Sequence, residues 1–189
     1  GECSVEECLI KNVVKNVSII PSNVNLAAAE IELIGVDKKE YILKNEIDWI
    51  RDQYDFIIID CPPSLGLITT NALNASDSVL IPVQCEYYAL EGLSQLMSSV
   101  QAVKRRYNDR LELEGVLLTM YDGRLNLTQQ VVTEIKKYFP RKVFATVIPR
   151  TVRLSEAPSY GQPILYYDKS NKGCIAYGAL VDEILKKNR

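Results

Sequence analysis

The 189-residue sequence contains no histidine, and that absence excludes several kinds of active site. Ser-His-Asp and Cys-His catalysis, imidazole general bases and histidine-ligated zinc all require the missing side chain. The five cysteines are scattered, and no two form a C-x-x-C pair, which excludes a zinc ribbon and a thioredoxin-type redox site. Their odd number and spacing are typical of a reduced, cytosolic protein.

Long apolar runs and linkers are missing too. No stretch of 18 apolar residues occurs, so the sequence predicts no membrane-spanning segment. No repeat and no Pro/Gly/Ser-rich segment divides the chain, and 47% hydrophobic with 24% charged residues is the usual balance of a globular protein. This length suits one α/β domain and is short for two, so we expect residues 1–189 to form a single domain.

Positive and negative charges nearly cancel over the whole chain but not within its separate parts. The net charge of −2 argues against a strongly basic nucleic-acid coat. Residues 1–103, however, carry a net charge of −9, residues 104–153 carry +6, and residues 154–189 carry +1. A nearly neutral chain with one basic third could still present a basic face.

Short apolar runs alternate with longer amphipathic segments. The runs are continuous, which favours strands buried on both faces, and they cover residues 17–20, 56–59, 79–83, 116–120 and 143–148. Helical spacing predicts helices near 24–34, 40–53, 67–75, 89–106, 126–138 and 174–187. The alternation predicts an α/β fold with a doubly wound, mostly parallel sheet, helices on both faces, and ligands at the carboxyl ends of the strands.

The strongest chemical signal is an apolar run, Phe56–Ile59, that ends in Asp60 and is followed by Cys61 and two prolines. Proline cannot continue the hydrogen-bonded ladder of a strand, so the carboxylate is expected at the functional edge of the sheet. This is the layout of a Walker B element, in which a carboxylate holds phosphate-bound Mg²⁺, usually through a water. The alternative is a core strand that simply leaves the sheet in an acidic turn.

Four segments resemble the ParA/Soj family of chromosome- and plasmid-partitioning ATPases, which belong to the deviant P-loop class together with MinD. They are Phe56–Leu67, Val79–Gln95, Glu114–Leu127 and Thr146–Pro163, and they follow the family's order. The resemblance covers nearly the whole chain. It implies a P-loop NTPase-like fold, ATP and Mg²⁺ as ligands, and Asp60 as the catalytic and Mg²⁺-binding carboxylate.

The sequence departs from this family at the phosphate-binding loop. No glycine is followed by lysine, so the motif G-x-x-x-x-G-K-S/T cannot be drawn anywhere. We therefore expect an N-terminally truncated domain without the family's first strand, P-loop and second strand. In the family the P-loop strand lies between the strands matching 56–60 and 79–83, so its absence should leave unpaired edges or force these two together. We expect this chain alone to bind ATP weakly and not to hydrolyse it.

The resemblance also implies that two arginines contribute to non-specific DNA binding. Arg124 follows the run 116–120, and Arg153 is the second arginine of a Pro-Arg-x-x-Arg segment. Both lie in the basic third, and guanidinium groups on loops can contact phosphates without reading bases. The alternative is a pair of solvated loop arginines.

Met120, Pro149 and Arg150 end the last two runs. Similar proteins place the adenine base near these turns, and methionine and proline offer flat apolar contacts to a purine. Ordinary loop packing is the alternative for these three residues.

The segment that follows the run 79–83 contains Glu86, Tyr87 and Tyr88. By resemblance it would lie in the interface of an ATP-bound homodimer, and tyrosine suits interfaces, although adjacent tyrosines are also common at sheet edges. The family further implies non-specific DNA and a ParB-type protein as partners, and a nucleoid-associated place in the cytoplasm.

Two other functions compete with a partition ATPase. A MinD-like membrane ATPase needs a basic amphipathic C-terminal helix, but the predicted helix 174–187 has no Trp or Phe, and it carries Asp182 and Glu183 beside its apolar stripe. A helix docked on its own core, without stable membrane association, fits better. The second rival is a non-catalytic paralogue without a P-loop that acts as a binding partner.

Overall fold

The computed structural model describes residues 3–62, 64 and 66–188, and these divide into two compact units. One unit comprises Gly1–Ser78 with Ser98–Glu112, and the other comprises Val79–Met97 with Leu113–Arg189. We describe each unit by itself, beginning with the second, which contains most of the sheet.

The second unit is built on a three-stranded sheet in the order β3-β4-β5, formed by β3 (Ser78–Gln84), β4 (Glu112–Tyr121) and β5 (Val143–Pro149). β4 and β5 pair in parallel. These strands cover the three apolar runs predicted at 79–83, 116–120 and 143–148. The predicted α/β class is therefore confirmed.

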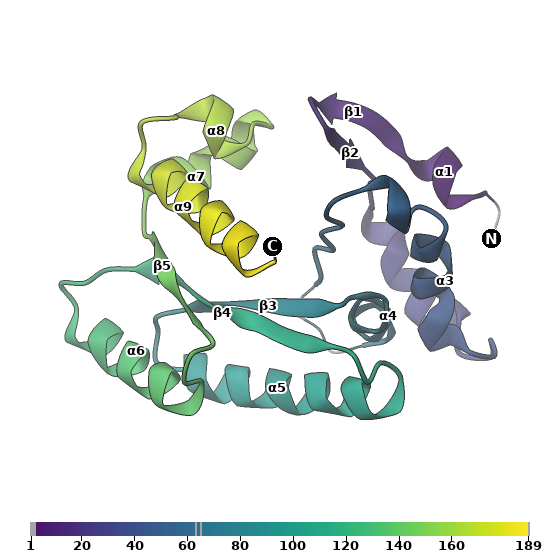
Figure 1. Ribbon diagram of the computed structural model, residues 1–189, viewed down its shortest axis with the longest axis horizontal. Helices are drawn as coiled ribbons and strands as arrows, with labels where there is room; N and C mark the ends of the chain where they lie inside the picture. The colour runs from purple at the N-terminus through teal and green to yellow at the C-terminus, as the bar shows by residue number, and fades with distance from the viewer. Residues whose placement is uncertain (1–2, 63, 65, 189) are drawn as a thin grey trace. The chain divides into compact units, whose positions relative to one another are not determined.

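Helices cover both faces of this sheet. On one face lie α5 (Ala89–Arg106) and α6 (Asn126–Tyr138), and on the other lies α9 (Lys172–Lys187), as Figure 1 shows. Successive strand residues point to opposite faces, and the two apolar clusters follow that alternation. The α5/α6 face buries Ile81, Val83, Val116 and Leu118, and the α9 face buries Leu117, Phe144 and Ile148.

β5 contains a bulge whose backbone forms hydrogen bonds with a side chain of α9. Val116 pairs with Val143 and Leu118 with Val147, so β5 has two more residues than β4 over this stretch. The carboxylate of Glu183 accepts hydrogen bonds from the backbone N–H groups of Ala145 (2.8 Å) and Thr146 (3.0 Å) within the bulge. These two backbone donors are thus paired by a side chain.

The apolar stripe predicted for the C-terminal helix is divided between core and solvent. Leu180 is buried and Ile184 packs beside it against β5, whereas Val181 is exposed. Docking of this helix on its own core is therefore confirmed for the inner part of the stripe. Among the residues that the structure describes, no helix is long and apolar enough to cross a membrane.

Short helices follow β5 and lead into α9: α7 (Val152–Glu156), η4 (Ala157–Tyr160) and α8 (Ile164–Tyr167). Thr151 caps α7 by accepting from the backbone of Arg153 at 3.2 Å, and Asn171 caps α9 by accepting from Gly173 at 2.8 Å. The Thr151 hydroxyl also donates to the Asn171 amide oxygen at 3.3 Å. This bond ties the starts of the two helices together.

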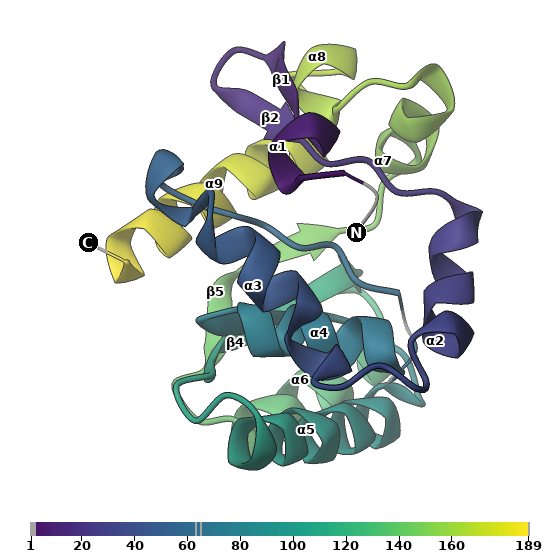
Figure 2. The same cartoon turned by 90° about the vertical axis from the view of Figure 1, so that its right-hand side faces the viewer.

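In the first unit, α3 (Ile42–Asp48) lies against α4 (Leu67–Ala75), as Figures 1 and 2 both show. Buried asparagines hold them. Asn71 accepts from the Leu43 backbone and Asn74 donates to the Glu40 carbonyl oxygen. Asn108 donates to three carbonyl oxygens at the C-terminal end of α4, of residues 73, 74 and 76. Backbone groups that α4 leaves unpaired at its end are thereby satisfied.

The N-terminal part of the first unit differs from the sequence prediction. After α1 (Val5–Cys8), β1 (Ile10–Val14) and β2 (Val17–Ile19) form an antiparallel hairpin, so the run 17–20 is not a strand of the parallel sheet. The helix predicted at 24–34 is shorter and divided into η1 (Val24–Ala28) and α2 (Ala29–Glu32). The helix predicted at 40–53 is α3 flanked by η2 (Lys39–Tyr41) and η3 (Arg51–Gln53).

The prediction of a strand at residues 56–60 is also wrong. Residues 56–60 belong to no strand, and Phe56 and Ile58 are 50% and 91% exposed. A strand exists only through a hydrogen-bonded partner, and these residues have none in the described part of the chain. β3 likewise ends the sheet on one side.

Candidate functional site

The carboxyl ends of β4 and β5 bring together the three residues predicted near the adenine base. Tyr121 pairs with Pro149, and the backbone N–H of Arg150 donates to the Tyr121 carbonyl oxygen at 3.2 Å. Met120 directly precedes Tyr121 in β4, and Arg150 directly follows the last residue of β5. The contact between Arg150 and Tyr121 follows from the parallel pairing of the two strands.

Met120 has a left-handed backbone conformation, with φ of 52°. Left-handed conformations cost a residue with a side chain about 1 kcal/mol or more, and they cluster at functional turns. The pairing register also shifts between Leu118 and Tyr121. The sequence does not predict the left-handed conformation of Met120, because methionine has no preference for such turns.

Arg124 lies just beyond β4 and forms a close pair with Asp122. Asp122 Oδ1 accepts from Arg124 Nε at 2.9 Å and from its backbone N–H at 3.1 Å, and Oδ2 accepts from Nη2 at 2.6 Å. The hydrogen bonds from the Arg124 side chain and backbone hold the pKa of Asp122 well below its usual range. The Arg124 side chain is nevertheless 89% exposed, so part of it faces solvent.

Arg153, in α7, lies in a cluster with Glu156, Tyr167 and Asp168, which we call the Arg153 cluster. Arg153 Nη1 donates to Glu156 Oε2 at 2.9 Å and to the Tyr167 hydroxyl at 3.4 Å, and Nε lies 3.6 Å from Asp168 Oδ2. The Tyr167 hydroxyl donates to Glu156 Oε2 at 3.1 Å. Burial and then the bond to Glu156 raise the pKa of Tyr167. Sequence reasoning missed these partners, since Tyr167 and Asp168 lie 14 and 15 positions further along.

The predicted dimer segment lies beyond β3 and is open to solvent. Tyr87 and Tyr88 are 74% and 75% exposed, and their rings meet edge to face with centroids 5.2 Å apart. The Glu86 carbonyl oxygen accepts from the backbone N–H of Ala89, at the start of α5. Two exposed aromatic rings beside each other provide contact area for a partner.

Asp60 belongs to the first unit, and it is exposed in a segment without regular structure. Beside it, burial and then the Asp60 charge raise the pKa of Cys61. Pro63 and Leu65 of the same motif fall outside the described residues. A carboxylate suits Mg²⁺, but no three potential metal ligands gather among the described residues, and the sequence supplies no Gly-Lys phosphate loop. These residues do not fit tightly bound Mg²⁺–ATP.

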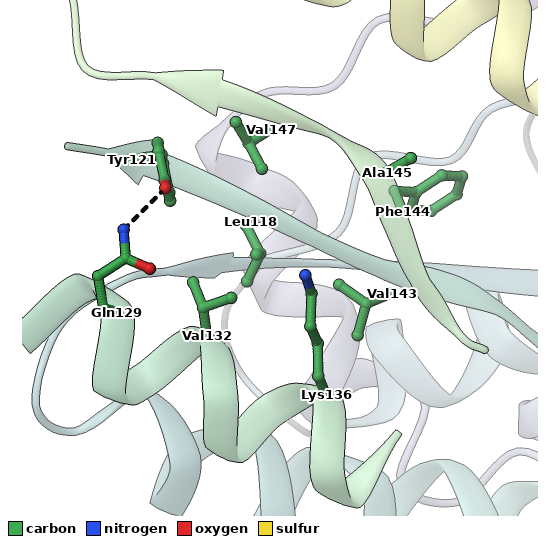
Figure 3. Close-up of a pocket in the computed structure, with 9 residues that line it drawn as sticks. All are labelled: Leu118, Tyr121, Gln129, Val132, Lys136, Val143, Phe144, Ala145 and Val147. Carbon is green, nitrogen blue, oxygen red and sulfur yellow. Dashed lines mark hydrogen bonds between the residues drawn. The ribbon is translucent and has the colours of Figure 1, made fainter. Parts of the chain in front are cut away.

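A groove of about 300 Å³ lies between α6 and strands β4 and β5 (Figure 3). Apolar side chains such as Leu118, Val132 and Val147 line it, and Gln129 donates to the Tyr121 hydroxyl at 3.1 Å across one end. Of its nine lining residues, only Lys136 is charged. This groove contains none of the residues predicted to bind nucleotide, metal or DNA.

Comparison with known proteins settles the family. A family model described as an AAA domain matches residues 1–113. The sporulation initiation inhibitor protein Soj of Bacillus subtilis is 54% identical over 183 residues, which are 97% of this chain and 72% of that protein. The chain belongs to the ParA/Soj family of chromosome-partitioning proteins. Another member, the chromosome partitioning protein ParA of Myxococcus xanthus, is 50% identical over 97% of this chain and 65% of its own length.

Solved structures agree with the ParA/Soj fold. A Mycobacterium smegmatis protein, named cobyrinic acid a,c-diamide synthase and solved with an ATP analogue and magnesium, has a TM-score of 0.84 and 32% identity. The match covers 98% of this chain and 69% of that protein. The P-loop NTPase-like fold expected from the sequence is therefore confirmed, as is the membership of a family of partition ATPases.

Proposed function

We propose that this chain is the DNA-facing part of a ParA-type partition ATPase. In this proposal Arg124 and Arg153 contact the phosphates of duplex DNA without reading its sequence. ATP binding and hydrolysis by the complete protein control when that face is used. The chain by itself keeps the DNA-facing residues and lacks the phosphate loop.

One observation carries the DNA proposal: both arginines follow the carboxyl ends of neighbouring parallel strands. Arg124 lies three residues beyond the end of β4, and Arg153 lies four residues beyond the end of β5. The bond from Arg150 to Tyr121 joins these two ends. The two cations therefore leave the sheet at the same edge, where one DNA backbone could meet both. Residues 104–153, which end at Arg153, carry the chain's excess of positive charge.

Duplex DNA of random sequence tests this proposal. We expect binding of the chain to weaken steeply as salt rises, because cations that neutralise phosphates release counterions. Arg124→Glu or Arg153→Glu should lower the affinity about ten-fold at low salt and reduce the slope of log K against log [salt] by about 0.9. Fluorescence anisotropy at several salt concentrations measures both quantities.

Arg141→Glu is the matched control. Arg141 is exposed and precedes β5, so it lies at the opposite edge of the sheet. It already has φ of 65°, and glutamate would meet the same backbone cost. If Arg141→Glu weakens DNA binding as much as the other two changes, net charge and not position explains the binding, and the proposed face is wrong.

We propose further that Asp60 is the Mg²⁺ carboxylate of the complete protein and that Met120, Pro149 and Arg150 lie beside its adenine base. The strained backbone of Met120 supports a functional turn at this place. Without a phosphate loop, the purified chain should show no Mg²⁺-dependent ATP turnover. Turnover that disappears in Asp60→Ala would contradict this expectation.

Dimerisation and partner binding complete the proposal. Glu86, Tyr87 and Tyr88 would lie in the interface of an ATP-bound homodimer, and the exposed ring pair supports this placement. A ParB-type protein and the nucleoid are the expected partner and location. Against a MinD-like membrane function stands the docking of Leu180 and Ile184 on the core. Sedimentation with anionic liposomes would test that alternative.

A further inference from the structure

The two arginines of the proposed DNA face are held in different ways, and the difference has a functional meaning. Arg124 has one carboxylate partner, Asp122, and 89% of its side chain is exposed. Arg153 has two carboxylate partners and a tyrosine hydroxyl, and 53% of its side chain is exposed. Arg124 is therefore presented to solvent, whereas Arg153 is partly enclosed.

The charges of the two groups differ as well. Arg124 and Asp122 together are neutral, but the Arg153 cluster combines one cation with the two carboxylates of Glu156 and Asp168. The charged side chains of this cluster sum to about −1, so its two carboxylates oppose the approach of a DNA phosphate to Arg153. A phosphate that approaches Arg153 must therefore compete with two carboxylates for the charge of the guanidinium group.

The enclosure of Arg153 is built from several elements and is not a chance surface pair. Tyr167, in α8, donates to the same Glu156 oxygen that accepts from Arg153, so Glu156 is fixed from two sides. The ring of Tyr160 stacks on that of Tyr167 with centroids 5.2 Å apart. Asp168 is held by a hydrogen bond of 2.9 Å from the Ser170 hydroxyl. The carboxylates are therefore already in place before any ligand arrives.

We propose that Glu156, with Tyr167 and Asp168 in support, is a positioning residue that withholds Arg153 from DNA and so makes its phosphate contact conditional on an exchange of partners. This inference rests on the proposed DNA-binding function. It adds a built-in restraint on that function: the chain binds DNA less tightly than its cations alone allow. In this proposal Arg124 makes the first contact with a DNA phosphate, and Arg153 makes its contact when a phosphate takes the place of Glu156.

A double-mutant cycle with Glu156→Gln and Arg153→Ala tests the restraint on random-sequence duplex DNA. Removing the Glu156 charge should tighten binding about two- to five-fold, the range that an exposed ion pair allows, and steepen the salt dependence. Tyr167→Phe, which keeps the ring and removes the hydroxyl, should tighten binding by a smaller factor. Arg153→Ala should weaken binding more in the Glu156→Gln background than in the native one.

Glu134→Gln is the matched control, because it removes one carboxylate from an exposed pair with Lys137 on α6 and changes the net charge equally. Equal gains from Glu156→Gln and Glu134→Gln, or a Glu156→Gln gain that persists with Arg153→Ala, would overturn the restraint. Arg124→Glu separates this outcome from failure of the proposed function. If Arg124→Glu lowers the affinity about ten-fold while Glu156→Gln acts like its control, the DNA face stands and the restraint does not.

Discussion

The carboxylate of Glu183 allows a quantitative prediction about the stability of β5. It accepts from two adjacent backbone N–H groups, of Ala145 at 2.8 Å and of Thr146 at 3.0 Å, inside the bulge. Hydrogen bonds to a charged group contribute about 1.5–3 kcal/mol each when they are well shielded. Ala145 is exposed and Glu183 is half-buried, so in the variant water can replace part of the hydrogen bonding that Glu183 provides. We therefore expect Glu183→Ala to lower the free energy of unfolding by about 2 kcal/mol.

The pH dependence of this effect has a definite sign. Burial raises the pKa of Glu183, but the backbone donors of Ala145 and Thr146 lower it by more, and the folded-state pKa lies below the usual value. The stabilisation is therefore complete above the unfolded pKa of about 4.3 and is lost as the pH falls through the folded pKa. The difference between native chain and variant should be full at neutral pH and shrink in acid.

Urea denaturation followed by circular dichroism measures this difference. With a slope of about 2 kcal/mol per molar urea, the midpoint should move down by about 1 M, without a change in slope. Asp182→Ala is the control, since Asp182 is the exposed neighbour on the same helix. If both variants unfold at the same midpoint, or if the Glu183 effect grows in acid, the reasoning about the bulge is refuted.

Two packing predictions concern one residue in each unit. A Cβ at Gly173 would lie 2.7 Å from Leu154 Cδ1, so Gly173→Ala should lower the free energy of unfolding by about 1–3 kcal/mol, whereas Gly178→Ala, with open space around it, should have little effect. Asn108→Ala removes three hydrogen bonds to the end of α4 and should cost about 2–3 kcal/mol. Thermal unfolding checks both predictions. A Gly173→Ala chain as stable as the Gly178→Ala chain would contradict the close contact with Leu154, and an Asn108→Ala chain as stable as the native one would contradict the stabilising role of the three hydrogen bonds.

Sequence periodicity was sufficient wherever a segment finds its partners within the described chain. The helices at 67–75, 89–106 and 126–138 have the predicted bounds, and the three strands of the sheet lie within a few residues of their apolar runs. The run 56–59 fails because a continuous apolar run describes a strand buried between two neighbours, and within the described residues this run pairs with no strand. An apolar run predicts a strand only on the condition that something pairs with it.

The positions of the candidate site residues in the fold were predictable to a similar degree and for the same reason. Residues adjacent to strand ends, such as Arg124 and Arg150, are placed by local sequence. The partners of Arg153 are not, because Tyr167 and Asp168 reach it only through the path of α7 and α8. The left-handed backbone of Met120 also depends on the register between β4 and β5, which no local pattern encodes.

The side of β3 that pairs with no strand among the described residues has a consequence for self-association. The Cys85 N–H, just past the strand, donates to the Thr119 carbonyl oxygen in β4 at 3.3 Å. Donors alternate between the two sides of a strand, so position 82 faces away from β4, and that position is Pro82, which has no N–H to offer. A strand added beside β3 would lack one backbone hydrogen bond in the middle of the pairing, at Pro82. Proline in the last strand of a sheet limits edge-to-edge aggregation, and Pro82→Ala should therefore make the chain precipitate at lower concentration.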